Sequence, residues 1–283
     1  MSAIATFAGR ARRHGSFRIG ALLLLLFAGT ALLSLFWTPH GAETVAMRLR
    51  LQPASATHWL GTDHLGRDVL SRIMVGAQTS IAVGLLAVTL GMGVGVALGA
   101  WAAARRGWVD EALSRSSDLI FAFPAVLIAI LIASVLGASA TNAVLAIAIF
   151  NVPVFARVTR GAALAMWGRD FVRAATAMGQ GPLRITLRHI LPNVASVLIV
   201  QATIQFAVAI LAEAGLSYLG LGAQPPIPSW GRMLRDAQTY IFQSPELAIW
   251  PGLAIALAVL GLNMLGDGLR DLLDPRLRLM RVG

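Results

Sequence analysis

Residues 171–193 read FVRAATAMGQGPLRITLRHILPN, a polar, arginine-bearing stretch between segments that are almost wholly apolar. Asp170 is expected to cap a first short helix over 171–178, because its carboxylate can accept hydrogen bonds from the free N–H groups of a helix start. Gly179 then supplies a left-handed stop, and Pro182 suits the first position of a second helix. The stretch therefore predicts a rigid helix–glycine–helix elbow outside the membrane, which another protein can grip.

The second helix of this elbow is predicted to end at Leu191 and Pro192. Arg184 and Arg188 share one of its faces. Its apolar stripe consists of Leu183, Leu187 and Ile190. Such a helix fits the groove of a partner protein, and a helix that lies on anionic lipid is the competing interpretation.

The composition places most of the chain in lipid. Of its 283 residues, 57% are hydrophobic and 13% are charged, and the mean hydropathy is +0.73. Soluble domains carry about 25% charged residues. The chain contains neither lysine nor cysteine, which excludes a Walker A lysine, a Schiff-base lysine, disulfides and thiolate metal sites. If nucleotide energy drives this protein, another chain must bind the nucleotide.

Six apolar segments predict an all-α polytopic membrane protein, because about 20 residues of helix cross about 30 Å of hydrocarbon. The first segment has the basic start of a signal peptide but lacks a small-residue cleavage site, so we interpret it as a retained anchor. The fourth is short and contains Asn151 and Pro153, which predict an interruption. The six segments are 19–37, 79–104, 119–136, 140–155, 194–211 and 247–265.

The distribution of arginine predicts the orientation. With six spans, both termini and the loops 105–116 and 157–191 lie on one side and carry 17 of the 23 arginines, whereas the opposite side carries six. The positive-inside rule makes the first side cytoplasmic. This rule also explains the net charge of +10 without nucleic acid. The predicted divisions are a cytoplasmic segment 1–18, extracytoplasmic loops 38–78 and 212–246, and a cytoplasmic tail 270–283.

Polar residues at membrane depth are candidates for the lining of a transport path. Gln201, Gln205 and Glu213 recur at a spacing that places them on one side of a helix, and hydrogen bonding between helices is an equally good explanation. Asn151 beside Pro153 predicts either a gate or a static kink. A second pattern is a stripe of small residues, suited to close helix packing within the chain or against another subunit; it comprises Ala87, Gly91, Gly95, Gly99 and Ala103.

No catalytic or metal site is predicted. His58, Asp63 and His64 are close in sequence, but their spacing does not match a helical ligand pair, and a turn built on Gly61 and Gly66 explains them better. An intramembrane hydrolase would require acidic or histidine pairs inside the spans. A lone channel or secondary transporter stays open as an alternative, although the two halves show no repeat.

The elbow sequence RAATAMGQGPLRITLRHILPN resembles the EAA motif of binding-protein-dependent ABC transporter permeases. Three further stretches are similar to the dipeptide/oligopeptide/nickel subfamily, and specifically to the second of its two permease subunits: HWLGTDHLGRDVLSRIMVGAQTSIAVGL, EAGLSYLGLGAQPPIPSWGRML and LGDGLRDLLDPRLR. The resemblance extends from about residue 22 to about residue 277.

The resemblance implies a permease core over 79–269 in a bacterial inner membrane, with the elbow as the coupling helix. It implies as partners a homologous permease, two ATPases that bind ATP and magnesium, and an extracytoplasmic substrate-binding protein; this chain itself would hold no cofactor. The substrate would be a di- or oligopeptide, with nickel or another small solute as the alternative. The coupling residues would be Arg173, Ala174, Ala175, Gly179, Arg184, Arg188 and Pro192. Arg173 departs from the motif, which has an acidic residue at that position.

Overall fold

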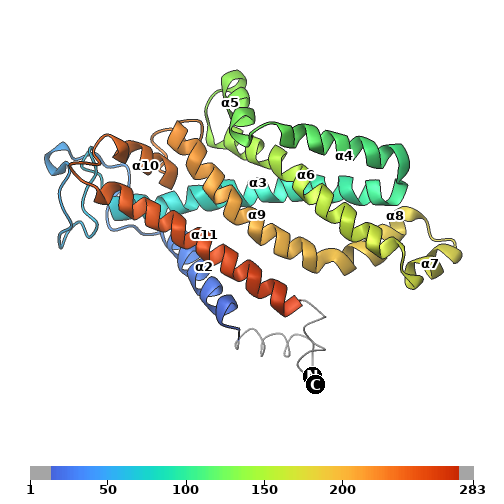
Figure 1. Cartoon of the computed structure of the whole chain (residues 1–283). Coiled ribbons are helices and arrows are strands. Elements are labelled where there is room, and N and C mark those ends of the chain that lie inside the picture. Colours follow the sequence, from blue (N-terminus) through green and yellow to red (C-terminus); the bar gives the residue numbers. More distant parts are fainter. Residues whose placement is uncertain (1–13, 274–283) are drawn as a thin grey trace.

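The computed structural model describes residues 14–273, which are helices and connecting loops without a strand in that range. Figure 1 shows the long helices lying side by side, with α10 and the loops that precede α3 at one end and α7 and α8 at the other. The elements are α2 (Gly15–Leu33), η1 (Met47–Leu49), α3 (Val69–Arg105), α4 (Gly107–Ala122), α5 (Ala125–Leu136), α6 (Ala140–Trp167), α7 (Asp170–Ala177), α8 (Pro182–Ile185), η2 (Thr186–Ile190), α9 (Leu191–Leu219), α10 (Trp230–Gln238) and α11 (Glu246–Leu273). Most of the predicted segment 1–18 and of the tail 270–283 lies outside the described residues.

The number of possible membrane spans agrees with the sequence. Within residues 14–273, five helices or helix runs are long and apolar enough to cross a bilayer, and α4 with α5 makes a sixth if this bent pair is one span. The continuous third span predicted over 119–136 is wrong, because α4 and α5 meet at an angle of 84°. Phe123 precedes Pro124 and takes an extended conformation, which is the conformation that a following proline ring favours.

The small-residue stripe of α3 packs within the chain. A Cβ atom at Gly91, Gly95 or Gly99 would collide with α6, and the nearest α6 atoms include backbone groups of Ala148 and Ala156. The absence of side chains on this face lets the two helix backbones approach closely, as small residues do in membrane bundles. Of the two explanations that the sequence left open for the stripe, packing inside the bundle is therefore the one that the structure supports.

The interruption predicted in the fourth span is absent. Helix α6 continues through Pro153 and ends at Trp167, well beyond the predicted end at residue 155. Pro153 is buried in the bundle. Proline inside a membrane helix is tolerated where neighbouring helices hold the chain in place, and α6 packs against α3 on one side and α9 on another.

Helices α2 and α11 lie side by side and bring the start of one to the end of the other. His14 Nε2 lies 3.1 Å from a carboxylate oxygen of Asp271. Gly20 and Gly268 face the opposite helix so closely that a Cβ atom at either position would meet backbone atoms there. The described start of α2 and end of α11 therefore lie on the same side of the bundle.

Helix α10 closes the other end of the bundle. Trp230 is buried, its indole N–H donates a 3.0 Å hydrogen bond to the carbonyl oxygen of Ile73, and its ring meets Phe27 edge-on at 4.6 Å. Because Gly76 of α3 has no side chain, the indole ring of Trp230 fits against α3 at this position. The tryptophan thus joins α10 to the first turns of α3 and to α2.

Candidate functional site

The elbow predicted from the sequence is present at the end of the bundle opposite α10 (Figure 1). Helix α7 ends in a pair of backbone hydrogen bonds, from Gly179 to Thr176 at 2.9 Å and from Gln180 to Ala175 at 3.2 Å. This is a Schellman motif, and Gly179 takes the left-handed conformation that the motif requires, with φ of 76°. Local backbone chemistry therefore fixes where α7 stops.

Two details at the start and end of the elbow differ from the prediction. Asp170 is the first residue of α7 rather than its cap, and its carboxylate pairs with Arg173. Pro192 does not end the second helix, because the chain continues from α8 through the π-helical turn η2 into α9. The side-chain amide of Asn193 donates a 2.6 Å hydrogen bond to the backbone carbonyl oxygen of His189. The wider turn accommodates the proline, as π-turns inside helices do.

The inner side of the elbow is anchored in a small apolar core. Val172 and Ala175 of α7 are buried there together with Ile185 and Ile190. The same cluster contains Ala103 from the end of α3 and Ala163 from α6. The elbow is therefore packed directly on the ends of α3 and α6.

The outer side of the elbow is apolar and exposed. Leu183 and Leu187 are 73% and 56% exposed, so the predicted stripe is divided: Ile190 faces the core and the two leucines do not. Met178 is 71% exposed and Phe171 is 44% exposed. The predicted coupling residues lie on or beside this surface except for Ala175, which is buried; the exposed ones are Arg173, Ala174, Gly179, Arg184, Arg188 and Pro192.

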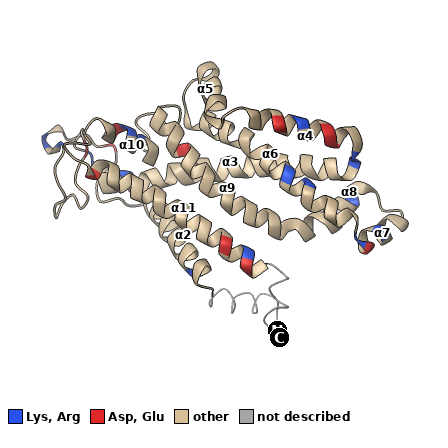
Figure 2. Ribbon diagram, viewed as in Figure 1, with Lys and Arg blue, Asp and Glu red and all other residues tan. Residues whose placement is uncertain are grey.

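Charged residues gather toward the ends of the bundle and are scarce along the middle of the helices (Figure 2). The elbow contributes a group of arginines, two of which, Arg184 and Arg188, are exposed and form no ion pair with the described residues. Among residues 14–273, Arg173 pairs only with the exposed Asp170. The elbow thus combines exposed apolar side chains with unneutralised positive charge.

Of the predicted path residues Gln201, Gln205 and Asn151, the last two contact each other. Gln205 of α9 donates a 2.8 Å hydrogen bond to the side-chain oxygen of Asn151 on α6, and both are buried. Gln201 is half-buried one turn away and lines a different groove, together with Arg270 of α11. The structure therefore unites Asn151 with Gln205 and leaves Gln201 apart.

Glu213 connects α9 to α3 through a hydrogen bond from Ser80. Its carboxylate accepts hydrogen bonds from Ser80 of α3 at 2.9 Å and from Ser217 of its own helix at 2.7 Å, and the residue is 1% exposed. Ser217 in turn accepts a hydrogen bond from the backbone N–H of Ala223. Glu213 therefore organises the junction of α3, α9 and the loop that leads to α10.

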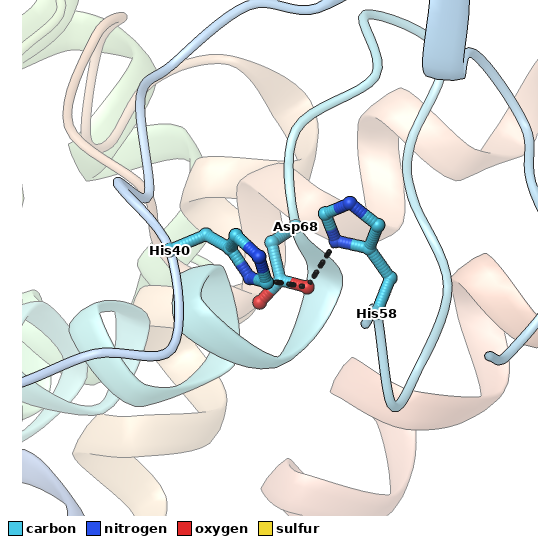
Figure 3. Close-up of side chains that lie close together, drawn as sticks. All are labelled: His40, His58 and Asp68. Carbon is cyan, nitrogen blue, oxygen red and sulfur yellow. Dashed lines mark hydrogen bonds and ion pairs between the residues drawn. The ribbon is translucent and has the colours of Figure 1, made fainter. Parts of the chain in front are cut away.

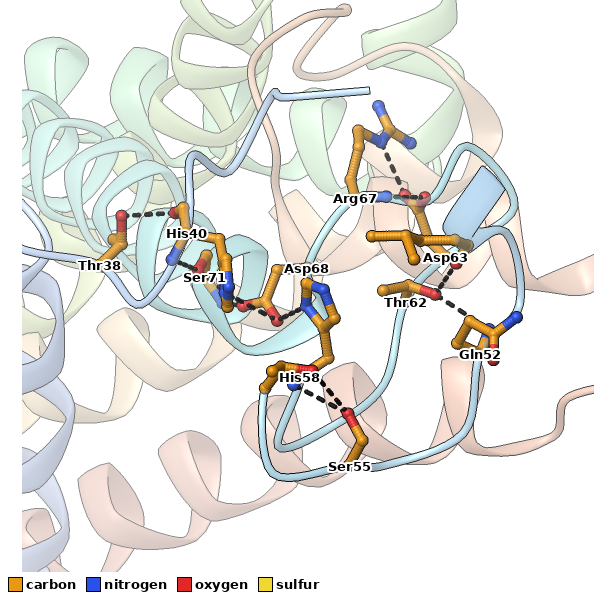
Figure 4. Close-up of polar contacts among 12 residues, drawn as sticks. Thr38, His40, Gln52, Ser55, His58, Thr62, Asp63, Arg67, Asp68 and Ser71 are labelled. Atoms are coloured by element: carbon orange, nitrogen blue, oxygen red, sulfur yellow. Dashed lines mark hydrogen bonds and ion pairs between the residues drawn. The ribbon is translucent and has the colours of Figure 1, made fainter. Parts of the chain in front are cut away.

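The loop before α3 is held by a network of charges. Asp63 pairs with Arg72 and with Arg67, the latter at 2.7 Å, and both arginines also face Asp236 of α10. Burial alone would raise the pKa of the Asp63 carboxyl, but Arg72, Arg67 and two backbone N–H groups outweigh it and hold the pKa below its ordinary value. Figure 4 shows Asp63 with the backbone and side chain of Arg67.

His58, Asp63 and His64 are close in sequence but do not converge on one point among the described residues. His64 stacks on Tyr240 at 5.2 Å, and burial lowers the pKa of this histidine despite the nearby Asp63. His58 contacts Asp68 and His40 (Figure 3). Sequence spacing gave no sign of that grouping, because its members belong to three separate segments.

The comparisons with known proteins agree with this geometry. Residues 95–279 match the family model described as "Binding-protein-dependent transport system inner membrane component". The glutathione transport system permease protein GsiD of Pectobacterium atrosepticum is 43% identical over 269 residues, which cover 94% of this chain and 89% of the relative. The dipeptide transport system permease protein DppC of Alkalihalophilus pseudofirmus is 44% identical over 260 residues, which cover 92% of this chain and 86% of the relative.

A solved structure has a similar fold. A chain of the MetNI methionine ABC transporter in an inward-facing conformation superposes with a TM-score of 0.56 at 18% identity, covering 70% of this chain and 95% of that chain. At this identity the likeness concerns the fold alone. The family match and the two relatives extend over most of the sequence, including the elbow. The chain therefore belongs to the family of binding-protein-dependent transport system inner membrane components, and it is a permease subunit of an ABC importer.

Proposed function

We propose that this chain forms half of the translocation path of an importer for small peptides, such as di- or oligopeptides. The names of its relatives, which are glutathione and dipeptide permeases at 42–44% identity, support this substrate class. A homologous permease supplies the other half of the path. An extracytoplasmic binding protein delivers the peptide, and two ATPase subunits bind ATP and magnesium.

The observation that carries the proposal is the elbow, an exposed apolar surface on a rigid, buried base. Met178 and Leu183 present this surface to the outside, while the inner side of the elbow packs on the ends of α3 and α6. Force applied to the surface therefore reaches the long helices directly. The elbow is the contact through which an ATPase subunit moves the permease, and Arg173, Ala174, Ala175, Gly179, Arg184, Arg188 and Pro192 form or support that contact.

Arg173 replaces the acidic residue of the family motif at this contact. Its partner Asp170 is 92% exposed in its side chain, and exposed ion pairs contribute little to stability, about 0–1 kcal/mol. The arginine is therefore free to exchange Asp170 for a carboxylate of another protein. The ATPase subunit of this importer carries an acidic residue opposite Arg173.

The orientation follows from the arginine distribution. The elbow, both termini and the turn between α3 and α4 are cytoplasmic, and the loops 38–78 and 212–246 are extracytoplasmic. The path lies along a cavity of about 330 Å³ between α5, α6 and α9. Asn151 of α6, which accepts a hydrogen bond from Gln205 of α9, supplies the polar side chain among the described lining residues. Gln201 lies on α9 as well, nearer to its cytoplasmic end.

The test uses the complete importer, purified with its ATPases and reconstituted in liposomes with its binding protein. The double variant Met178→Ser and Leu183→Ser removes apolar surface from the elbow, and Phe242→Ser removes an exposed aromatic ring, 100% exposed, from the loop after α10. Both changes leave the apolar cores untouched. We expect the elbow variant to lose ATPase subunits on purification and ATP-driven uptake of labelled dipeptide, and Phe242→Ser to keep its ATPase subunits.

Two outcomes contradict the proposal. Equal retention of the ATPases by both variants removes the elbow from the contact. ATP-independent uptake by this chain alone supports instead a lone channel or secondary transporter.

A further inference from the structure

Three separate segments bring His40, His58 and Asp68 together outside the membrane helices (Figure 3). His58 Nδ1 lies 2.9 Å and His40 Nδ1 lies 3.6 Å from the same oxygen of Asp68, Oδ1. The two imidazole rings are 4.3 Å apart between centroids. One potential ligand atom from each residue therefore lies within 4.8 Å of the others.

The carboxylate of this cluster is buried and fixed. The side chain of Asp68 is 1% exposed. Its second oxygen, Oδ2, caps α3 by accepting hydrogen bonds from the backbone N–H of Ser71 at 2.8 Å and from its hydroxyl at 2.7 Å. Only Oδ1 therefore faces the rings, and it cannot turn away without loss of the helix cap.

The two histidines are held by their own backbone (Figure 4). The N–H of His40 donates to the hydroxyl of Ser71 at 3.0 Å, and the N–H of His58 donates to the hydroxyl of Ser55 at 3.0 Å. These two bonds hold the main chain in place at both histidines.

One nitrogen in the cluster lacks a partner. Nδ1 of His40 is shielded from solvent and accepts or donates no hydrogen bond in the described part of the chain. Its direction is toward Oδ1 of Asp68, at a distance too long for a hydrogen bond. A buried polar atom without a partner costs free energy, and a cation between the nitrogen and the oxygen would supply the missing interaction.

The ligand types and distances fit one ion. Two imidazoles and a carboxylate are ligands that zinc and neighbouring first-row metals accept. Ligand atoms about 2.1 Å from a tetrahedral zinc lie about 3.4 Å from each other. The two distances to Oδ1, 2.9 Å and 3.6 Å, lie on either side of this value, and a bound ion would replace the hydrogen bond between His58 Nδ1 and Oδ1.

We propose that His40, His58 and Asp68 bind a divalent first-row metal ion such as zinc, with the fourth position open to water. His40 is 40% exposed in its side chain and gives the ion a route from solvent. The ion ties two loop segments to the first turn of α3, which begins beside Arg72 and its charge network. The metal is a structural ion that stabilises the extracytoplasmic loop 38–78, and it is not the transported substrate.

The experiment measures zinc binding by the full importer complex after removal of metal with a chelator. Equilibrium dialysis against zinc chloride gives the bound zinc per complex, and a thermal melt gives the shift of Tm with zinc. His40→Ala removes one ligand whose side chain makes no hydrogen bond to residues 14–273. His64→Ala is the matched control, because that histidine lies in the same loop outside the cluster. Asp68→Asn removes the ligand charge and keeps an oxygen for the helix cap.

We expect the wild type and His64→Ala to bind one zinc more per copy of this chain than His40→Ala, and to gain Tm with zinc. The affinity of this site in His40→Ala and Asp68→Asn falls by at least about tenfold, since changes even outside the ligand shell cost 10–100-fold. Equal zinc content in the wild type and His40→Ala overturns the proposal and leaves a hydrogen-bonded loop. Loss of zinc in His64→Ala as well assigns the ion to another site and also overturns it.

Discussion

Gln205 and Asn151 link α9 to α6 through a 2.8 Å hydrogen bond between buried side chains. The amide nitrogen of Asn151 has no hydrogen-bond partner in the described chain, so the pair is only partly satisfied. Hydrogen bonds between membrane helices contribute about 0.6 kcal/mol on average. The pair is therefore a modest contribution to stability at a place where a transport path would need a polar group.

Replacing Gln205 and Asn151 by apolar residues of similar size measures how much their hydrogen bond contributes to stability. Gln205→Met leaves the oxygen of Asn151 unpaired, and Asn151→Leu leaves Gln205 unpaired. We expect each single change to lower the free energy of unfolding by about 1 kcal/mol. The double variant recovers part of this loss, and the cycle gives a coupling of about 0.6 kcal/mol, measured by thermal or denaturant melts in detergent.

Transport by the same variants separates the two roles of the pair. If Asn151 lines the path, Asn151→Leu reduces peptide uptake in the reconstituted importer more than Gln205→Met does at equal stability. A fall in uptake that simply tracks stability in both variants assigns the pair to packing alone.

Close packing of α3 on α6 predicts a contrast between two neighbouring glycines. A Cβ atom at Gly95 collides with backbone and side-chain atoms of α6, whereas a Cβ atom at Gly93 meets nothing within 4 Å. We expect Gly95→Ala to destabilise the bundle by about 1–3 kcal/mol through overpacking. Gly93→Ala is neutral or stabilising, because alanine favours helix by up to about 1 kcal/mol. Melting temperatures of the two purified variants make the comparison, and equal values contradict the close contact.

The Schellman turn predicts a similar contrast in the elbow. Gly179 has φ of 76° and Gly181 has φ of −71°, and neither has a neighbour that would meet a Cβ atom. Gly179→Ser therefore strains the backbone by about 1 kcal/mol, whereas Gly181→Ser supplies a favourable helix cap. We expect only Gly179→Ser to reduce ATP hydrolysis stimulated by the binding protein, by several-fold. Identical stimulation in the two variants means that the shape of the elbow does not limit coupling.

Asp63 predicts acid sensitivity of the outer loop. Its pKa is held below the ordinary value in the folded chain, so the stability it contributes is complete above the unfolded pKa of about 3.9 and is lost as pH falls through the lower folded pKa. Hydrogen exchange of residues 38–68 between about pH 5 and about pH 2 measures this loss. Asp63→Asn lowers the protection of these amides from exchange at neutral pH, by about 3 kcal/mol, and removes the dependence of their protection on acid. If the variant keeps the acid dependence of the wild type, another group causes it.

The parts of the fold that the sequence predicted correctly depend on local chemistry. Gly179 and Pro182 define the elbow because each constrains its own backbone, and neither constraint needs a distant partner. The apolar segments predict helices in lipid for the same reason. Pro192 was misjudged, because a proline stops a helix only where the chain cannot widen, and the π-helical turn η2 provides that width.

The remaining features depend on contacts between distant segments. The choice between packing and subunit contact for the glycine stripe required the position of α6. The grouping of His40 with His58 and Asp68 required a loop that returns to the start of α3. Continuation of α6 through Pro153 required the support of two neighbouring helices. In each case the deciding group lies many residues away, where single-sequence periodicity carries no information.

The bend between α4 and α5 predicts that the angle of this corner depends on the thickness of the bilayer. Phe123 donates its backbone hydrogen bond to Ile120, and Leu127 donates to Pro124, so each bond remains on its own side of the 84° corner. These backbone hydrogen bonds do not resist opening of the corner. The stiffness of the corner comes from the packing of α5 on α6. A thick bilayer favours a straighter pair and a thin one a sharper corner, at fractions of a kcal/mol per Å of mismatch. The thickness of the surrounding lipid therefore sets the angle between α4 and α5.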